Sequence, residues 1–221
     1  MLIIALLLAI GLSLYAQFKV KKNYEEFSKV ASNSGMTGAQ VAKTILDKSG
    51  VYDVSVQPIN GQLTDHYDPR SKTVRLSEGV YGSTSLSAVS IAAHEVGHAI
   101  QHNEEYVPLT IRSILAPIAS FTSNFVMILI MVGFFFQIMK LVDIGIIFYT
   151  VAVLFQVITL PVEFNASDRA LENLENFDIL TADEISGSKK VLSAAALTYV
   201  GATAVSAIQL LRLIAMRNSR D

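Results

Sequence analysis

The chain has 221 residues, of which 52% are hydrophobic, and its formal net charge at pH 7 is -2. So small a net charge does not suggest a nucleic-acid or acidic partner, and no nucleic acid is expected to bind. The absence of cysteine excludes disulfide bonds and thiolate metal sites, and the hydrophobicity favours a small soluble region joined to membrane segments.

Four stretches contain no charged residue or histidine and are long enough to be considered as membrane helices. They are residues 2–18, 113–139, 144–162 and 191–211. Because about 20 apolar residues span a bilayer as a helix, the second and third stretches are expected to cross the membrane. The fourth is rich in Ala, Ser and Thr, so it either spans or packs as a helix against the others. Three to four transmembrane helices are therefore predicted.

The first apolar stretch is interpreted as an uncleaved membrane anchor. A signal peptide would begin with basic residues, whereas here Lys19, Lys21 and Lys22 follow the stretch. By the positive-inside rule, these lysines hold the region that follows in the cytoplasm. The arginines after residue 211 would lie outside if the fourth stretch spans, which counts against either that span or this orientation.

Residues 19–112 have the composition of a soluble region, and a helix is expected near their start. Thr37 stands three residues before Gln40, which is the pattern of a capping box at a helix N-terminus. Apolar residues then recur at helical spacing until Gly50, which is typical of a helix end.

Three short strands are expected after this helix. Residues 54–56 alternate between valine and a polar side chain, and Asn60 with Gly61 is a hairpin-turn signal. Residues 63–67 would return as a second strand, and residues 74–76 indicate a third. This order predicts a small antiparallel β meander.

A second helix is expected from Ser85 to about His102. Its apolar residues are spaced by three and four, as on one buried helix face: Leu86, Val89, Ala93, Val96 and Ile100. The chain then enters the second apolar stretch.

The sequence His-Glu-Val-Gly-His at residues 94–98 lies on this helix and is the strongest functional signal. Residues four apart share one helix face, so His94 and His98 can reach a single ion. Zinc accepts imidazole nitrogens, and a catalytic site leaves one position for water. Glu95 is rotated by about 100° from His94, so it can take a proton from that water instead of binding the ion. The alternative is that two helical histidines flank a glutamate by chance.

A catalytic zinc site of this type needs a third protein ligand. His102 lies about 12 Å along a straight helix from His94, too far to share one ion. Glu163 is the better candidate, because the second and third stretches return the chain to the side that carries the histidines. The alternative for Glu163 is an ordinary carboxylate that ends a membrane span. Asp168 could accept the free ring N–H of a ligand histidine, or it could simply be an exposed residue early in a helix.

Three segments of the chain resemble the YugP-type neutral zinc metallopeptidases of bacterial membranes. They are His-Glu-Val-Gly-His-Ala-Ile-Gln at 94–101, Pro-Val-Glu-Phe-Asn-Ala-Ser at 161–167 and Leu-Thr-Asp-His-Tyr-Asp-Pro at 63–69. The order of apolar stretches also matches along nearly the whole chain. The resemblance to the HtpX and CAAX prenyl protease group, whose third ligand lies in a Glu-x-x-Ala-Asp motif, is more distant.

The resemblance implies that His94, His98 and Glu163 bind zinc and that Glu95 is the catalytic base. It also implies a location in a bacterial cell membrane. The chain departs from the wider group at one position, because Ser167 stands where that group has Asp and Asp168 follows one residue later. This departure leaves open which residue supports the ligand histidines.

His66 and Tyr67 are weaker candidates. A peptidase of this kind needs a hydrogen-bond donor for the oxyanion, and either side chain could provide one from a strand beside the cleft. An exposed strand edge could also bind substrate as an added strand. The alternative is a hairpin with solvated polar side chains.

Together these patterns predict a mainly α membrane protein with a gluzincin-like motif helix, a small antiparallel β meander and three to four transmembrane helices. The expected divisions are an anchor at 1–18, a cytoplasmic catalytic region at 19–112, a transmembrane hairpin at 113–162, a third-ligand segment at 163–190 and a spanning or packed helix at 191–221. The predicted function is a membrane-anchored zinc metallopeptidase that acts on a peptide or membrane-protein substrate at the lipid bilayer.

Two other functions are compatible with parts of the pattern. One is a non-catalytic membrane scaffold in which zinc is structural or absent. The other is a site-2-type intramembrane protease, which also carries the two-histidine motif. That class places the motif inside a span and pairs it with Leu-Asp-Gly, whereas this chain has no Leu-Asp-Gly and flanks its motif helix with glutamates. No residue pattern specifies a cleavage preference or an oligomeric state.

Overall fold

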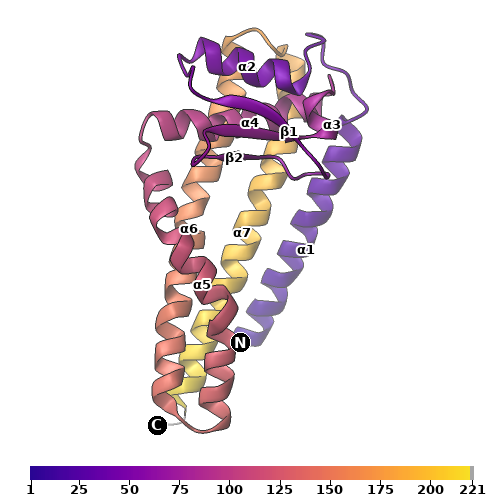
Figure 1. Ribbon diagram of the computed structural model, residues 1–221. Helices are drawn as coiled ribbons and strands as arrows, with labels where there is room; N and C mark the ends of the chain where they lie inside the picture. Colours follow the sequence, from indigo (N-terminus) through magenta and orange to yellow (C-terminus); the bar gives the residue numbers. More distant parts are fainter. Residues whose placement is uncertain (220–221) are drawn as a thin grey trace. The chain divides into compact units, whose positions relative to one another are not determined.

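The computed structural model describes residues 1–219, with the backbone alone at residues 121–124. Arg220, one of the arginines used above to judge orientation, lies outside the described residues, as does Asp221. Along the described chain the elements are α1 (Leu2–Phe27), α2 (Gly38–Lys48), β1 (Ser55–Ile59), β2 (His66–Asp68), β3 (Thr73–Ser77), α3 (Glu78–Tyr81), α4 (Leu86–Asn103), α5 (Val107–Phe135), α6 (Met139–Asn176) and α7 (Ala182–Asn218), as Figure 1 shows. The chain is therefore mainly helical, as predicted.

The chain divides into two compact units. One, called here the helical unit, is formed by Met1–Tyr15, Val107–Pro161 and the chain from Leu197 onward. The other, called the α/β unit, is formed by Ala16–Tyr106 and Val162–Ala196. The boundaries fall inside α1, α6 and α7, so these long helices each contribute residues to both units.

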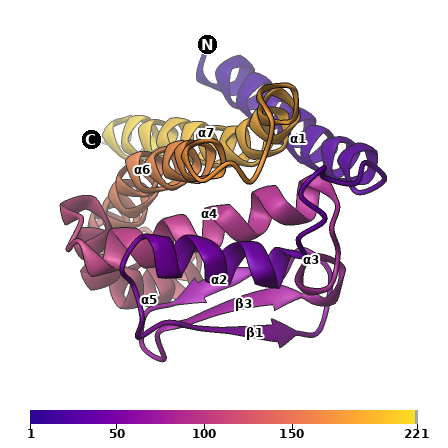
Figure 2. The same cartoon turned by 90° about the horizontal axis from the view of Figure 1, so that it is seen from above.

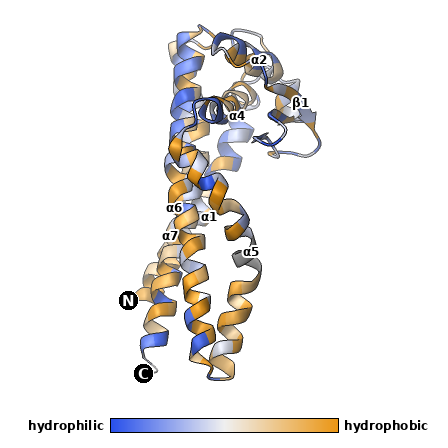
Figure 3. Ribbon diagram, turned by 60° about the vertical axis from the view of Figure 1, so that its left-hand side comes forward, coloured by the Kyte–Doolittle hydropathy of each residue, from blue (hydrophilic) through white to orange (hydrophobic). Residues whose placement is uncertain are grey.

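The helical unit is strongly hydrophobic, as the colouring of α5 and of the neighbouring parts of α6 and α7 makes visible in Figure 3. Among the described residues, α1, α6 and α7 are each long and apolar enough to cross a membrane. Helix α5 becomes a fourth candidate when its parts Val107–Ser120 and Phe125–Phe135, inclined at 48°, are counted as one span. Three to four apolar helices agree with the predicted number of spans, although the second stretch qualifies only as this bent pair.

Small residues allow the helices of this unit to approach one another closely. A Cβ added to Gly145 would lie 2.4 Å from Cγ1 of Ile130, and one added to Gly201 would lie 2.9 Å from Cα of Ser13. Such contacts are typical of helix pairs in membranes, where packing replaces the hydrophobic effect. The unit therefore has the sequence features of a membrane bundle.

The sheet of the α/β unit has the strand order β1-β3-β2, and this corrects the predicted antiparallel meander. Strand β1 pairs with β3 in parallel, and only β2 is antiparallel to β3. The expected hairpin at Asn60–Gly61 does not form: after Gly61, with φ of 107°, the chain crosses to the far side of β3.

The backbone of β1 explains why the hairpin partner is missing. The N–H of Ser55 donates to the carbonyl of Lys72 beside β3, so alternate residues of β1 face β3 and the others face the free edge. Pro58 is one of the residues at the free edge, and proline has no N–H to offer a further strand. A returning strand would lose a hydrogen bond there, and the edge is protected from added strands.

Helix α4 lies at the centre of the α/β unit, beside α2 and above the sheet in Figure 2. Its N-terminus is capped by Ser85, whose hydroxyl accepts from the N–H of Ala88, and the predicted helix is confirmed. The predicted capping box of α2 is also confirmed, with reciprocal hydrogen bonds between Thr37 and Gln40. Residues from α2, β3, α4, α6 and α7 share one apolar core, which holds α4 rigidly in place.

Candidate metal centre

Two neighbouring turns of α4 and one turn of α6 bring three potential metal ligands together. Nε2 of His94 lies 3.4 Å from Oε2 of Glu163, and Nε2 of His98 lies 3.7 Å from the same oxygen. One ligand atom from each of the three residues can be chosen so that all lie within 4.8 Å of one another. The Glu163 side chain is only 3% exposed, so it is buried against the two imidazoles.

These three donors fit a zinc ion. Two imidazole nitrogens and one carboxylate oxygen form a usual protein ligand set of catalytic zinc, which keeps its fourth position for water. A carboxylate this buried requires a positive partner, since an unpaired buried charge is costly. The chemistry of the donors and their burial therefore suit a divalent metal.

Gly97 permits the close approach of α4 to α6 on which the site depends. A Cβ at this position would lie 2.6 Å from the carbonyl oxygen of Ala166, which is far inside van der Waals contact. Glycine inside a helix costs roughly 1 kcal/mol relative to alanine, so the close packing offsets a local penalty. The glycine within the two-histidine motif thus sets the separation of the histidines from Glu163.

Gln101 links the His98 ring to α6. Its side chain is fully buried, and its Oε1 lies 3.0 Å from Nδ1 of His98. Its Nε2 donates to the carbonyl of Val162 and to Oδ1 of Asn165, both at 2.9 Å. Because Val162 directly precedes Glu163, one side chain orients a histidine and holds the backbone beside the carboxylate.

His94 is held by a smaller contact. Its Nδ1 lies 3.2 Å from the hydroxyl of Ser167, on the turn of α6 that follows Glu163. With both Nδ1 atoms engaged by side chains, the Nε2 atoms of the two rings are left facing the carboxylate. Asp168, the next residue along α6, is exposed.

The electrostatic environment of the site favours positive charge. Burial by itself lowers the pKa of His98, but the hydrogen bond with Glu163 and the negative charges of Glu95 and Glu163 outweigh it, and the pKa is raised. The negative charge beside the His98 ring therefore favours a cation at this position.

Glu95 is buried on α4 but does not belong to the group of three ligands. It is 9% exposed and is rotated from His94 by about 100° around the helix. Its negative charge acts on the His98 ring and helps to raise the pKa of that ring.

Tyr67 and His66 lie on opposite faces of β2, because successive strand residues alternate. Tyr67 faces α4, where its hydroxyl lies 2.8 Å from Nδ1 of His102. His66 instead donates from Nδ1 to the carbonyl of Thr64 at 2.8 Å. His102 lies one helical turn beyond His98 and is too far along the helix from His94 to share its ion. It contacts Tyr67 instead.

Two aspartates around Tyr67 hold β2 in position. Asp65 accepts hydrogen bonds from the N–H and hydroxyl of Ser77. Asp68 accepts from Arg75 at 2.9 Å and from Ser71 at 2.7 Å, and Arg75 holds its pKa well below the usual range. The aspartates of the segment at 63–69 thus fix the strand that carries Tyr67.

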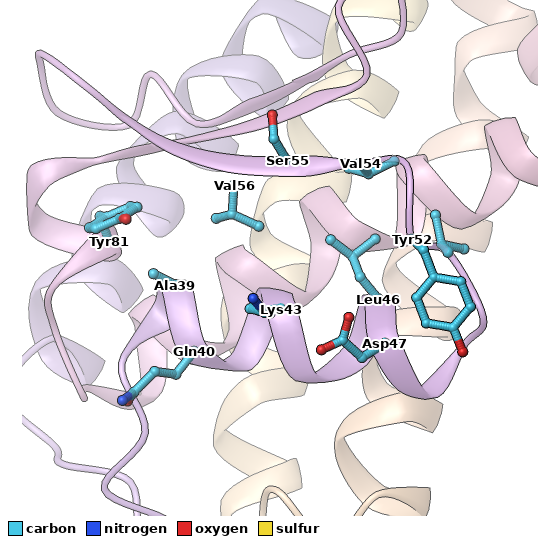
Figure 4. A pocket seen from close by; sticks show the side chains of 11 residues that line it. Ala39, Gln40, Lys43, Leu46, Asp47, Tyr52, Val54, Ser55, Val56 and Tyr81 are labelled. Atoms are coloured by element: carbon cyan, nitrogen blue, oxygen red, sulfur yellow. The ribbon is translucent and has the colours of Figure 1, made fainter.

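A separate pocket of about 510 Å³ lies between α2 and β1, as Figure 4 shows. Its lining combines apolar side chains such as Leu46 and Val56 with the charged Lys43 and Asp47. It is lined by no histidine and by none of the three candidate ligands, so it is distinct from the metal centre.

Gly97, Gln101 and Ser167 are the site residues that sequence reasoning did not assign. A glycine inside a helical pattern signals close packing and could have drawn attention to Gly97. Gln101 has one partner nearby in the chain, His98. The other partners of Gln101 and Ser167 lie 61 or more residues away. No local pattern announces such contacts.

Comparison with known proteins found a matching family and a similar protein. The family model described as "Putative neutral zinc metallopeptidase" matches residues 2–218. The chain is 51% identical over 214 residues to the protein of Bacillus subtilis (strain 168) named "Putative membrane protease YugP", and the match covers 96% of this chain and 95% of that protein. No solved structure matches the chain significantly. The resemblance to YugP-type proteins is therefore confirmed.

Proposed function

This chain belongs to the neutral zinc metallopeptidase family that its match over residues 2–218 identifies, and on that premise we propose that it is a membrane-anchored zinc metallopeptidase. The proposal is supported above all by one observation, the buried cluster of His94, His98 and Glu163. A carboxylate enclosed by two imidazoles serves little purpose in a scaffold, because a hydrophobic contact would hold α4 to α6 without burying charge.

In this proposal His94, His98 and Glu163 hold the zinc ion, which supplies a Lewis acid to the reaction when bound. Glu95 accepts a proton from the water whose oxygen attacks the carbonyl carbon of the peptide bond. As the C–N bond breaks, Glu95 gives this proton to the leaving amine nitrogen. The same carboxylate therefore acts first as a base and then as an acid.

Tyr67 is the better of the two proposed donors to the oxyanion. Burial, with smaller contributions from Asp53 and Asp68, raises its pKa to about 12, so the phenol keeps its proton at neutral pH. It also faces α4, whereas His66 is turned to the other face of β2. Asp168 remains a proposed support for a ligand histidine, although Ser167 and Gln101 already contact the two Nδ1 atoms.

The position of Glu163 in the chain supports a substrate at the membrane. Glu163 immediately follows the apolar stretch 144–162, so peptide bonds near the bilayer surface or in membrane proteins are the proposed substrates. Lys19, Lys21 and Lys22 support a cytoplasmic location for the site, by the excess of basic residues on that side.

The proposal is tested first by measuring zinc per chain in the detergent-purified protein and in Glu163→Ala, with the fold checked by circular dichroism. We expect one zinc per chain in the wild type and a large loss of affinity in the variant. Hydrolysis of an unfolded protein by Glu95→Gln is then compared with that of the wild type. We expect this variant to keep zinc and lose activity.

The outcomes separate the alternatives clearly. Full zinc affinity in Glu163→Ala would show that another residue is the third ligand. The scaffold would be favoured if the wild type bound zinc without hydrolysing protein. A spectrum of the bound metal should then show a fourth protein ligand. Unchanged hydrolysis by Glu95→Gln would exclude Glu95 as the base.

A further inference from the structure

Helices α1 and α7 are matched to one another in the α/β unit by two close contacts. Nδ2 of Asn23 donates to the carbonyl of Lys190 at 2.7 Å. A Cβ added to Gly187 would lie 2.9 Å from Cε1 of Phe27. The contact residues of α7 fall in number as those of α1 rise, so the two helices run antiparallel.

This register brings the charged ends of two apolar stretches to the same level. The stretch 2–18 ends directly before Lys19, and the stretch 191–211 begins directly after Lys190. Because Asn23 lies opposite Lys190, residues 19–22 and 189–190 fall within about 9 Å along the helix axes, at 1.5 Å per residue. A lipid headgroup layer is roughly 5–8 Å thick, and lysine side chains can extend towards it. The lysines of both helices therefore lie at the level of the headgroups of one leaflet.

The lysines also share one side of the helix pair. The opposite side is packed into the α/β unit, where Tyr24 of α1 is buried and Ser188 of α7 lies 2.6 Å from Ser90 of α4. Lys22 is rotated by about 200° from Tyr24, and Lys190 by about 200° from Ser188, at 100° per residue. Both lysines are exposed. With their neighbours on this outer side they form a group called here the lysine face, which consists of Lys19, Lys22, Lys189 and Lys190.

The positive charge of the lysine face has no partner inside the protein. Among the described residues no member of the face forms an ion pair, whereas Lys21, on the other side of Lys22, lies 3.9 Å from Glu25. Glu26 and Asp183 lie on the same side of their helices as the face, one turn after Lys22 and two turns before Lys190. Both are farther from the apolar stretches than the four lysines are. The charge nearest the apolar stretches is therefore positive.

We propose that the lysine face binds the headgroup of an anionic phospholipid at the ends of α1 and α7. The phosphate of a zwitterionic lipid is offset by the ammonium group of the same headgroup, so a cationic surface selects lipids with a net negative charge. Lysine is a point charge on a flexible stem, which suits a mobile headgroup. Each lysine beside an anionic surface strengthens the attraction by about fivefold. The face is separate from the metal ligands, so this inference goes beyond the proposed peptidase function and does not rest on it.

The first experiment measures the lipid preference of the full chain, reconstituted in bilayers of phosphatidylcholine. A trace of spin-labelled phosphatidylglycerol or spin-labelled phosphatidylcholine is added, and electron paramagnetic resonance gives the fraction of each label that is immobilised at the protein. We expect phosphatidylglycerol to be preferred several-fold at low salt. The preference should weaken at high salt, because salt screens exposed charges.

Two double variants locate the preference on the molecule. Lys22→Gln with Lys190→Gln removes one charge of the lysine face from each helix. Lys29→Gln with Lys43→Gln is the matched control, because it removes two exposed lysines of the same unit that lie away from the apolar stretches. We expect the preference for phosphatidylglycerol to fall by about threefold to tenfold in the first variant and to stay at the wild-type value in the control. Circular dichroism shows that both are folded.

Glu26→Gln tests the proposal in the opposite direction. It removes an exposed negative charge beside the lysine face, so the preference for phosphatidylglycerol should rise. A gain of this kind does not arise from loss of folding.

Three results would overturn the proposal. They are a wild type without preference for phosphatidylglycerol, an unchanged preference in the variant of Lys22 and Lys190, and an equal loss in the control. A wild type that selects phosphatidylglycerol through these lysines but binds no zinc would support this inference and contradict the proposed function.

Discussion

The two ligand histidines of α4 are only one helical turn apart, yet their surroundings differ. The turn around His98 is connected to a fully buried glutamine, which in turn reaches α6 through two further hydrogen bonds. The turn around His94 has a single hydroxyl contact, at 3.2 Å. A hydroxyl can rotate and either donate or accept, whereas the amide of Gln101 is held at both of its ends.

The difference shows how one helix can provide two unlike ligands. The His98 side is held more firmly, because both ends of the Gln101 amide make hydrogen bonds. The His94 side can exchange its partner with solvent at little cost. We therefore expect substitutions around His98 to affect metal binding more strongly than those around His94.

The largest effect is expected from Gly97→Ala, which disturbs both sides at once. The added Cβ would meet the carbonyl of Ala166 at 2.6 Å and would push α4 away from α6. Because metal ligands tolerate displacements of only about 0.2 Å, zinc affinity should fall by about 100-fold or more. Overpacking should also destabilise the fold by roughly 1–3 kcal/mol.

Gly11→Ala in α1 is the matched control for this prediction. A Cβ at Gly11 would meet no atom within 4 Å, so its zinc affinity should equal that of the wild type. Chelator competition and thermal unfolding measure both effects. Wild-type affinity in Gly97→Ala would show that the close approach of α4 to α6 is not required.

The next largest effect is expected from Gln101→Met, which removes the network on the His98 side at similar side-chain volume. Buried Nδ1 of His98 and the carbonyl of Val162 would both lose a partner. Unpaired buried polar groups cost about 1–3 kcal/mol each, and lost orientation of a ligand should reduce zinc affinity by about 10- to 100-fold. Isothermal titration with zinc, together with urea unfolding, would measure both.

Ser167→Ala should have a smaller effect, because water can replace the hydroxyl beside the partly exposed His94. We expect a loss of zinc affinity of less than about tenfold and little change in stability. The same titration as for Gln101→Met provides the comparison. A loss equal to or greater than that of Gln101→Met would reverse the proposed difference between the two sides.

The smallest effect is expected at β2, away from both histidines. Asp68 has a lowered pKa because of its hydrogen bonds with Arg75 and Ser71, so its contribution to stability is present above the unfolded value of about 3.9. This contribution is lost as the pH falls through the lower folded pKa. Asp68→Asn should therefore flatten the fall in melting temperature on the acidic side and leave zinc affinity at neutral pH unchanged. Identical curves for variant and wild type would contradict this role.

Much of the architecture could be predicted because it depends on local pattern. The capping box at Thr37 and Gln40, the span of the motif helix and the apolar stretches each follow from residues near one another in the chain. The strand pairing was predicted wrongly for the same reason. The turn signal at Asn60–Gly61 is local. The pairing of β1 depends instead on Pro58, which has no N–H to donate to a strand at the outer edge of β1.

The sequence by itself determined the chemistry of the candidate site. The spacing of His94 and His98 places them on one helix face. The return of the chain after the second and third apolar stretches, together with the family resemblance, indicated Glu163 as the third ligand. Only the tertiary structure decided how these side chains are oriented. Gly97 against Ala166, Gln101 against Val162 and Ser167 against His94 are contacts between α4 and α6. They depend on the packing of helices whose residues lie more than 60 positions apart, and no local pattern of residues specifies such packing.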